Sequence, residues 1–503
     1  MRLSDVLSLL DGDQPIGKAE RATDILGEVI QRVVCDARQA RRGDLFVALP
    51  GSRVDGHQFL GQAALGGATA ALVSRTWAQQ FGQTAPLPCL PVADTRVAMA
   101  LVAGALFDRP SETLKLVGVT GTNGKTTTTS LLRTLLVNLG VRAGLVGTLG
   151  AEFEGHQIVT GFTTPQSPEL QKVLRQLVNE GAQAVVMEVS SHAIDQARVY
   201  DCEFDVAIFT NLSRDHLDYH GSMAAYGAVK RRLFSQEATG HRPRASVINV
   251  DDALGQACAN LVTSGLLTYG LATGSEADLR AEVLESSASG SVFVAHFRGQ
   301  SGKVHLPLPG RFNVYNALAA VGAALAMGYE FSTVCDMVAK SAGVPGRVEV
   351  VSSAHHPFTV WVDYAHTPDG LHNVLSAARE LGPRRLVTVF GCGGDRDRTK
   401  RPLMGEVVEH WSDVAIVTSD NPRSEDPMAI INEIGLGMRG QQLVVVDRAE
   451  AIKKAIELAQ SGDLIVIAGK GHETTQTFAD RTVHFDDRDI ARHALHQLDK
   501  LSV

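Results

Sequence analysis

The residues best suited to chemistry lie between positions 117 and 130, where the sequence reads VGVTGTNGKTTTTS. An apolar run, a glycine-bearing turn and a helix start follow one another, which is the arrangement that binds a nucleoside triphosphate. The template GxxxxGKS/T requires glycine at 119, so Val119 makes this loop a variant, and a glycine turn that only caps a helix is the disfavoured alternative. Lys125 can reach the β and γ phosphates, and Thr126 can ligate Mg²⁺. The expected nucleotide contacts are Gly121, Thr122, Asn123, Gly124, Lys125, Thr126 and Thr127.

A second chemical group, Glu188, ends the apolar run AVVMEV at 184–189. On a strand beside the phosphate loop, its carboxylate would face the bound phosphates and is suited to hold Mg²⁺. A strand-end acid is more often a surface residue. The nearby phosphate loop favours the metal role here.

Parallel sheets are needed to position these groups, and the sequence predicts two of them. Buried strands alternating with helices predict a central nucleotide-binding α/β domain, and a second series predicts a Rossmann-like sheet. Shorter apolar runs at 45–49 and 68–74 predict a small α/β domain before them. The expected strands are 114–119, 184–189, 206–210, 246–250 and 266–270 in the centre, then 358–364, 385–391, 414–419, 443–447 and 463–469.

Two breaks in this pattern predict three domains. A helix before Leu114 ends at Arg109-Pro110, and a helical run from Val314 ends before Gly343-Val344-Pro345-Gly346, which is suited to a hinge. We therefore expect an α/β protein with a small N-terminal domain at 1–111, a central ATP-binding domain at 112–343 and a C-terminal Rossmann-like domain at 344–503.

The composition restricts the class of protein. With 503 residues, 44% of them hydrophobic, and a net charge of −8, the chain is expected to be globular and not a nucleic-acid binder. The six cysteines are scattered without a Cys-x-x-Cys pair, which favours reduced thiols. The N-terminus does not have the pattern of an export signal, and no apolar stretch has the length of a membrane span. A cytoplasmic protein without membrane insertion is expected.

Eight motifs in order give a resemblance that spans nearly the whole chain. They are GTNGKTT, MEVSSH, TNLSRDHLDYH, PGRFNVYNALAA, DYAHTPD, GCGGDRDRTKRP, DNPR and GKGHE. Together they resemble the Mur ligase family. The resemblance implies an ATP-dependent amide-bond ligase of cell-wall synthesis that uses ATP and two Mg²⁺ ions. It implies UDP-MurNAc-L-Ala-D-Glu and meso-diaminopimelate as small-molecule substrates, joined through an acyl phosphate, and we expect a monomer.

The resemblance also implies a catalytic centre. His216 resembles the ligand of a second Mg²⁺, with Asp215 and Asp218 suited to orient it. Lys230 resembles a lysine that is carbamylated by CO₂ and then offers an anionic oxygen. Without the resemblance, His216 would be structural and Lys230 one cation on a solvated helix face. The implied catalytic residues are Lys125, Glu188, His216 and Lys230, and the implied metal ligands are Thr126, Glu188, His216 and Lys230.

The acceptor and the incoming amino acid have implied contacts at both ends of the chain. Ala37 departs from the family, which commonly has Ser there, so a hydroxyl contact is absent or replaced. Arg423 is suited to pair with the far carboxylate of meso-diaminopimelate, although such an arginine is often only a surface residue. The implied acceptor contacts are Cys35, Ala37, Ser52, Arg53, Val54, Thr163, Thr164, Ser190, Gln196 and Arg198. The implied amino-acid contacts are Arg396, Asp420, Asn421, Pro422, Arg423, Gly469 and Glu473, and those to adenosine are Asn313, Arg347 and Asp363.

Three other functions remain open on the sequence. A lysine-adding ligase of the same family is opposed chiefly by Arg423. A folate polyglutamate synthetase is opposed by the N-terminal uridine-binding segment and by DNPR. A regulatory ATPase with a phosphate loop would leave DNPR and GKGHE without a role.

Overall fold

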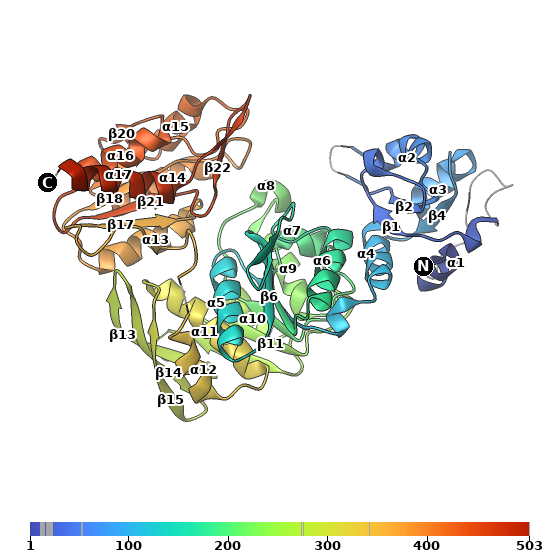
Figure 1. Ribbon diagram of the computed structural model, residues 1–503, viewed down its shortest axis with the longest axis horizontal. Helices are drawn as coiled ribbons and strands as arrows, with labels where there is room; N and C mark the ends of the chain where they lie inside the picture. Colours follow the sequence, from blue (N-terminus) through green and yellow to red (C-terminus); the bar gives the residue numbers. More distant parts are fainter. Residues whose placement is uncertain are drawn as a thin grey trace. The chain divides into compact units, whose positions relative to one another are not determined.

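The computed structural model describes residues 1–10, 16, 24–51, 54–272, 274, 276–341 and 343–501. Figure 1 shows the helices and strands coloured along the sequence, and the chain divides into two compact units. The first unit comprises 1–120, 141–207 and 229–245, and the second comprises 121–140, 208–228 and 246–503. Among the described residues, no helix is long and apolar enough to cross a membrane.

The N-terminal part of the first unit is a four-stranded parallel sheet, buried on both faces. Along β2, Leu45 and Val47 pack into one hydrophobic cluster while Phe46 packs into another, as expected for a strand whose side chains alternate between two covered faces. The strand order is β1 (Arg32–Val34), β2 (Asp44–Val47), β3 (Ala70–Ser74) and β4 (Cys89–Val92). The helices are α1 (Leu3–Leu9), α2 (Leu60–Gly66), α3 (Arg75–Phe81) and α4 (Thr95–Leu106).

The rest of the first unit carries the strand that leads into the phosphate loop. Its strand order is β5 (Lys115–Thr120), β9 (Ala184–Glu188), β6 (Ala143–Gly147), β7 (Gly150–Phe153) and β8 (His156–Ile158). The first three are parallel, and β7 and β8 return antiparallel. Helices α6 (Ser167–Asn179) and α7 (Ser191–Asp195) follow β8 and β9. The parallel strands therefore end at one sheet edge, where Glu188 lies.

Three elements contain residues of both units: β10 (Val206–Phe209), α9 (Met223–Arg231) and β11 (Ala245–Asn249). The first part of the second unit continues from β11 with β12 (Leu266–Gly270), β13 (Leu279–Ser287), β14 (Gly290–Phe297) and β15 (Gln300–Leu306), where β13 to β15 are antiparallel. Its helices are α5 (Lys125–Asn138), α8 (Leu217–His220), α10 (Ala253–Ala259), α11 (Arg311–Ala326) and α12 (Phe331–Val338).

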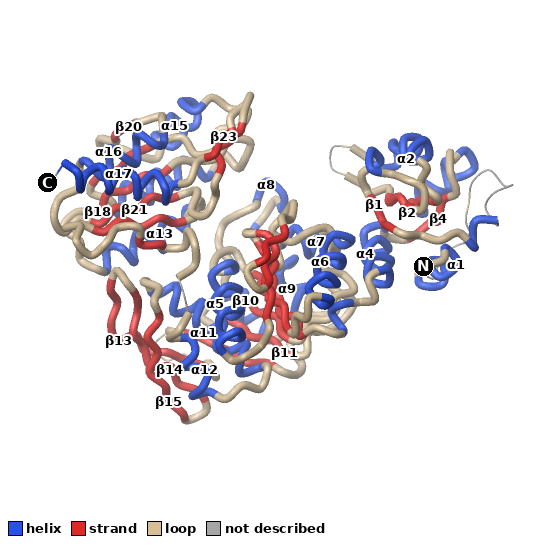
Figure 2. The backbone as a smooth tube through the Cα atoms, viewed as in Figure 1, coloured by secondary structure: helices blue, strands red, loops and turns tan. Residues whose placement is uncertain are grey.

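The C-terminal part of the second unit is a six-stranded sheet between two layers of helices. Helices α13 (Pro368–Glu380), α14 (Lys400–Trp411) and α15 (Pro427–Gly435) cover one face, and α16 (Arg448–Glu457) and α17 (Asp487–Leu501) cover the other (Figure 2). The strand order is β16 (Glu349–Val350), β17 (Thr359–Asp363), β21 (Leu464–Ala468), β18 (Leu386–Phe390), β19 (Val414–Val417) and β20 (Leu443–Val444). A small hairpin, β22 (Thr475–Thr477) and β23 (Thr482–His484), follows β21.

The predicted α/β class with parallel sheets is confirmed, and each predicted strand is present. Two predictions of extent were wrong. The strand expected at 443–447 is reduced to Leu443–Val444 at the sheet edge, and the helical run from Val314 is two helices, because Gly328 at φ 94° ends α11. The strands β13 to β15 were not predicted.

Candidate active site

The phosphate loop is built around two glycines that admit no side chain. Gly121 has φ 154° and Gly124 has φ 86°, and Gly124 caps the start of α5. A Cβ atom on Gly121 would lie 1.8 Å from Oγ1 of Thr210, and one on Gly124 would lie 2.3 Å from Oδ1 of Asn316. The strand, loop and helix therefore follow as predicted, with the α5 N-terminus open toward a phosphate.

The loop backbone is held by the segment that follows β10. Thr210 Oγ1 and Asn211 Nδ2 donate to the carbonyl oxygen of Asn123, at 2.7 and 3.1 Å. The amide of Asn123 donates to Oδ1 of Asn211 at 2.9 Å, and the amide of Ser213 donates to the hydroxyl of Thr122 at 3.0 Å. The loop is therefore preorganised.

The two side chains predicted to handle phosphate and metal have partners within the second unit. Nζ of Lys125 donates to the carbonyl oxygens of Gly121 and Thr122, at 3.0 and 2.8 Å, so the ammonium group lies over the loop. The buried hydroxyl of Thr126 accepts a hydrogen bond of 2.9 Å from Arg347. Thr127 lines the cavity described next.

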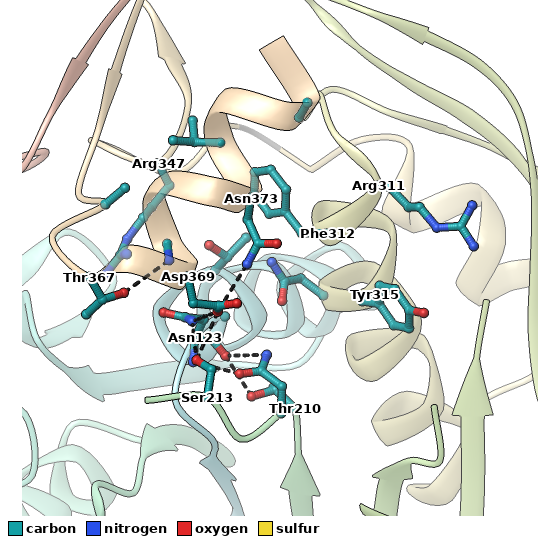
Figure 3. A pocket seen from close by; sticks show the side chains of 18 of the residues that line it. Asn123, Thr210, Ser213, Arg311, Phe312, Tyr315, Arg347, Thr367, Asp369 and Asn373 are labelled. Carbon is teal, nitrogen blue, oxygen red and sulfur yellow. Dashed lines mark hydrogen bonds between the residues drawn. The ribbon is translucent and has the colours of Figure 1, made fainter. Parts of the chain in front are cut away.

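A cavity of about 410 Å³ opens beside this loop, within the range of small-molecule sites (Figure 3). Its walls come from the phosphate loop, the segment after β10, the start of α11 and the segment from β17 into α13. Polar and aromatic side chains converge on it, among them those of Asn123, Ser213, Tyr315, Arg347, Thr367 and Asp369.

Asp369 is the central polar group of the cavity, and the sequence did not single it out. Its Oδ2 accepts hydrogen bonds from the side-chain amide of Asn123, from the hydroxyl of Ser213 at 2.9 Å and from the amide of Asn373 at 3.2 Å (Figure 3). One carboxylate thus joins the phosphate loop to the first turn of α13. The only sequence signal for it was its position in the motif DYAHTPD.

Of the three predicted adenosine contacts, two line the cavity. The guanidinium of Arg347 lies 4.6 Å from the ring centroid of Tyr364, in cation–π geometry. Asp363 accepts from the amides of Val348 and Ala365, at 2.8 and 2.7 Å, and burial raises the pKa of its carboxyl.

Asn313 is buried outside the lining of the cavity. Its amide donates to the carbonyl oxygen of Pro309 at 2.8 Å, and its Oδ1 accepts from Asn316 at 3.0 Å. Because Asn316 does line the cavity, Asn313 can orient it.

His216 lies in a left-handed turn, at φ 54°, immediately before α8. Its Nε2 is 3.3 Å from Oδ2 of Asp215, so Asp215 contacts the imidazole as expected, whereas Asp218 is exposed. Burial opposes ionisation of Asp215, but its interactions with His216 and Lys400 and the hydrogen bond from the backbone N–H of His216 favour the charged form, and the pKa of that carboxyl is lowered.

His366 is held neutral beside this carboxylate. Its Nδ1 bonds the carbonyl oxygen of Tyr364 at 2.8 Å, and Nζ of Lys400 donates to the carbonyl oxygen of His366 at 2.9 Å. Burial and the positive charge of Lys400 lower the pKa of His366 to about 4. The sequence had placed both residues in motifs without assigning them a role.

In the first unit, Glu188 is buried at the end of β9 with its carboxylate held by Thr148. The amide of Thr148 donates to Oε1 at 2.8 Å and its hydroxyl to Oε2 at 3.2 Å. The hydroxyl of Thr163 lies 3.2 Å from that of Thr148. Two predicted site residues thus meet through a residue that the sequence did not indicate.

The other predicted acceptor contacts gather beside them. The hydroxyl of Thr164 bonds the carbonyl oxygen of Glu188 at 2.9 Å and lies 3.3 Å from that of Ser190. Arg198 donates to the carbonyl oxygen of Thr164 at 2.8 Å and to Oε1 of Gln196 at 2.9 Å. This cluster brings four of the predicted residues together.

The remaining predicted residues of the first unit differ in how far they are buried. Lys230 is buried in α9, with 1% of its surface exposed, so it is not a cation on a solvated face. Ala37 is buried in the hydrophobic cluster with Phe46, whereas Cys35 and Val54 are exposed. The predicted contacts Ser52 and Arg53 lie outside the described residues.

At the carboxyl ends of β18 and β19, the structure places the side chains of two predicted arginines close to Gly393. A Cβ atom there would lie 3.0 Å from Nη1 of Arg423 and 3.9 Å from Cγ of Arg396. Arg423 donates to the carbonyl oxygen of Gly394 at 2.7 Å, and Arg396 to that of Asp395 at 3.1 Å. Burial and the charge of Arg396 lower the pKa of Arg423, so this site favours an incoming anion.

An acidic group completes the same region. Oε2 of Glu473 accepts from Nδ2 of Asn421 at 2.8 Å and from the buried Lys470 at 3.2 Å, while Nζ of Lys470 also bonds Oδ1 of Asn421 at 3.0 Å. A Cβ atom on Gly469 would lie 2.7 Å from Oδ2 of Asp420, which explains the glycine. Pro422 is buried between Asn421 and Arg423. The hydrogen bonds of Asn421 with Lys470 and Glu473 bring the predicted DNPR and GKGHE residues together.

Comparison with known proteins matches this architecture along the chain. Residues 29–105 match the Mur ligase family catalytic domain, 119–324 the Mur ligase middle domain, and 346–471 the Mur ligase glutamate ligase domain. A UDP-N-acetylmuramoyl-L-alanyl-D-glutamate–2,6-diaminopimelate ligase of Geobacillus kaustophilus is 44% identical over 92% of this chain and 94% of that protein. The enzyme of the same name from Synechococcus elongatus is 46% identical over 92% and 93%.

A solved structure of a UDP-N-acetylmuramoyl-L-alanyl-D-glutamate–2,6-diaminopimelate ligase superimposes with a TM-score of 0.66. It is 34% identical, and the match covers 93% of this chain and 95% of that one. The chain belongs to the Mur ligase family. Mur ligases are ATP-dependent ligases that use Mg²⁺, so the predicted family and enzyme class are confirmed.

Proposed function

We propose that this protein joins meso-diaminopimelate to the D-glutamate γ-carboxylate of UDP-MurNAc-L-Ala-D-Glu, with conversion of ATP to ADP and phosphate, in peptidoglycan synthesis. The pair of guanidinium groups at Arg396 and Arg423 carries the proposal, because it offers two cations to a ligand carboxylate. Relatives named for this reaction at 44% and 46% identity support it.

The reaction needs activation because a carboxylate is a poor electrophile. In the proposed first step, a γ-carboxylate oxygen of the acceptor attacks the γ-phosphorus of ATP and ADP leaves, which gives an acyl phosphate. The amine of the amino acid then attacks the carbonyl carbon, and phosphate leaves. Lys125 and the loop amides around Gly121 and Gly124 stabilise the charge of the transferring phosphoryl group.

The residues of the chain fit Mg²⁺, which prefers hard oxygen ligands. Glu188 offers a buried carboxylate in the first unit, and Thr126 offers a hydroxyl in the second. We include a second Mg²⁺ at His216 and a carbamate on the buried Lys230, which would add an anionic oxygen. Bound Mg²⁺ would neutralise phosphate charge during transfer.

Selectivity for meso-diaminopimelate follows from unpaired charge. Lysine lacks the far carboxylate, so its binding would leave Arg423 beside Arg396 without an anion. Glu473, supported by Asn421 and Lys470, is suited to an ammonium group of the amino acid. The proposal therefore favours this amino acid over the lysine-adding alternative.

The proposal extends to organisation and location. It assigns 1–111 to the uridine end of the acceptor, 112–343 to ATP, and 344–503 to the amino acid. The segment 343–346 serves as the hinge by which the amine reaches the acyl phosphate. A monomer that acts in the cytoplasm, where ATP is present, completes it.

The direct test uses the purified protein with ATP, Mg²⁺ and UDP-MurNAc-L-Ala-D-Glu, and compares meso-diaminopimelate with L-lysine. Phosphate release should require both acceptor and amino acid, with kcat/KM about 10⁴-fold higher for meso-diaminopimelate. Equal turnover of the two amino acids would contradict the selectivity. Phosphate release without an acceptor would instead indicate a regulatory ATPase, and activity only with a folate would indicate a polyglutamate synthetase.

A further inference from the structure

Thr148 lies where two neighbouring parallel strands end, next to a predicted metal ligand. β6 ends at Gly147 and pairs with β9, whose last residue is Glu188, in parallel register. Thr148 and Leu149 form a two-residue turn into β7, because Gly147 pairs with Gly150. The amide of Thr148 therefore lies outside the strand ladder and is free to donate to the carboxylate.

The carboxylate of Glu188 is fixed from several sides within the first unit. Thr148 bonds one carboxylate oxygen through its amide at 2.8 Å and the other through its hydroxyl at 3.2 Å. A Cβ atom on Gly147 would lie 2.5 Å from Oε1, so the strand end itself limits movement of the carboxylate. Thr164 holds the backbone carbonyl of Glu188 at 2.9 Å.

The direction of the hydrogen bonds between Glu188, Thr148 and Thr163 follows from simple chemistry. An ionised carboxylate can only accept, so the hydroxyl proton of Thr148 points to Oε2 of Glu188. In the 3.2 Å contact between the two threonines, Thr163 must then be the donor. The oxygen of Thr163 keeps lone pairs for a ligand. Thr163 can therefore accept a hydrogen bond from an amide N–H or a hydroxyl of the muramoyl substrate.

We propose that Thr148 is a positioning residue that orients the Glu188 carboxylate toward Mg²⁺ and links it, through Thr163, to the acceptor-binding turn. This inference rests on the proposed function, in which Glu188 ligates Mg²⁺. Groups that hydrogen-bond a ligating carboxylate typically change metal affinity or activity 10- to 100-fold when they are removed. Thr148 therefore determines how well the metal and the acceptor are held.

The test compares Thr148→Val, which keeps the branched shape and loses the hydroxyl, with Thr148→Ser, which keeps the hydroxyl and loses the methyl group. Thr239→Val is the matched control, since the buried hydroxyl of Thr239 bonds only the backbone of His241 in the described first unit. Mn²⁺ affinity is measured by electron paramagnetic resonance on the full chain with a non-hydrolysable ATP analogue. The ligation rate is measured against Mg²⁺ and acceptor concentration.

We expect Thr148→Val to weaken Mn²⁺ binding about 10-fold and to raise the KM for the acceptor, with Thr148→Ser and Thr239→Val close to wild type. Unchanged Mn²⁺ affinity in Thr148→Val would overturn the inference, as would an equal loss in Thr148→Ser, which would indicate packing alone. A wild-type protein that binds Mn²⁺ but does not ligate would refute the proposed function and leave the result on Thr148 readable.

Discussion

Two regions of the second unit hold their polar side chains in opposite ways. Around the phosphate loop, each of Asn123, Ser213 and Asp369 has hydrogen-bond partners in the protein itself. At the amino-acid end, Arg396 and Arg423 lie near one another and bond backbone carbonyls, and the pKa of Arg423 is lowered by burial and by its cationic neighbour.

The difference separates a general task from a selective one. A nucleotide site gains from a loop that is already in place, because ordering costs are then low on binding. A site that holds two like charges is completed by its ligand, and a ligand without the opposite charge gains little. We infer that ATP binds to a phosphate loop that is already ordered. The amino acid binds to a site whose positive charges are not balanced until the ligand is present.

The largest effect is expected when the ammonium group of the phosphate loop, on Lys125, is removed. Lys125→Met should lower kcat/KM for ligation by about 10²- to 10³-fold, because the transferring phosphoryl group loses a preorganised positive charge. Steady-state phosphate release measures it, with the exposed Lys340→Met as the matched control. A variant that keeps half the wild-type rate would contradict the role of Lys125 in stabilising the transferring phosphoryl group.

Arg423→Met tests the unbalanced positive charge at the amino-acid end. The kcat/KM for meso-diaminopimelate should fall about 100-fold, because a ligand carboxylate loses a desolvated partner. L-lysine should be affected much less, so the preference between the two amino acids should shrink by a similar factor. Competition assays measure the ratio, with the exposed Arg439→Met as control. Equal losses for both amino acids would mean that Arg423 serves only the fold.

Asp369→Asn weakens the hydrogen bonds that hold the phosphate loop and leaves Lys125 unchanged. An asparagine presents an N–H₂ group where the carboxylate accepts from Asn123 and Ser213, so we expect the KM for ATP to rise about 10-fold. Nucleotide titration measures it, with the exposed Asp336→Asn as control. A lower KM would show that Asp369 acts mainly by repelling phosphate.

The smallest expected effect concerns pH. The pKa of His366 is about 4 in the folded protein and about 6.5 in the unfolded chain, so the unfolded state binds more protons between these values. The stabilising contribution is complete above pH 6.5 and is lost as the pH falls toward 4. Urea unfolding of His366→Gln should show a weaker dependence on pH, by up to about 1.4 kcal/mol per pH unit.

The exposed His305→Gln is the control for this measurement and should keep the wild-type dependence. An identical dependence in all three proteins would remove His366 as the cause.

The sequence predicted what local patterns encode. Continuous apolar runs such as VAIV in β19 identify buried parallel strands, and glycine before Lys125 identifies a phosphate loop. Strand β13 escaped because most of its residues are exposed, so LRAEVLESS contains no apolar run. The edge strand β20 was predicted too long, since an edge needs fewer pairing residues than a central strand.

The site was predictable as far as residue type and motif order reach. Thr148 and Asp369 escaped because their roles come from contacts 40 and 246 residues away in the chain, to Glu188 and Asn123. Threonine and aspartate are common residue types, so neither type indicates such a role. The burial of Lys230 could not be predicted either, because a Lys-Arg-Arg run favours a solvated helix face.

The tight fit of Gly124 against Asn316 limits how this protein can vary. With Oδ1 of Asn316 only 2.3 Å from the position of a Cβ atom, a side chain at 124 would require the side chain at 316 to move or to become smaller. The two positions are therefore expected to influence one another, although 191 residues of other sequence separate them. A screen for second-site suppressors of Gly124→Ala would accordingly converge on the start of α11.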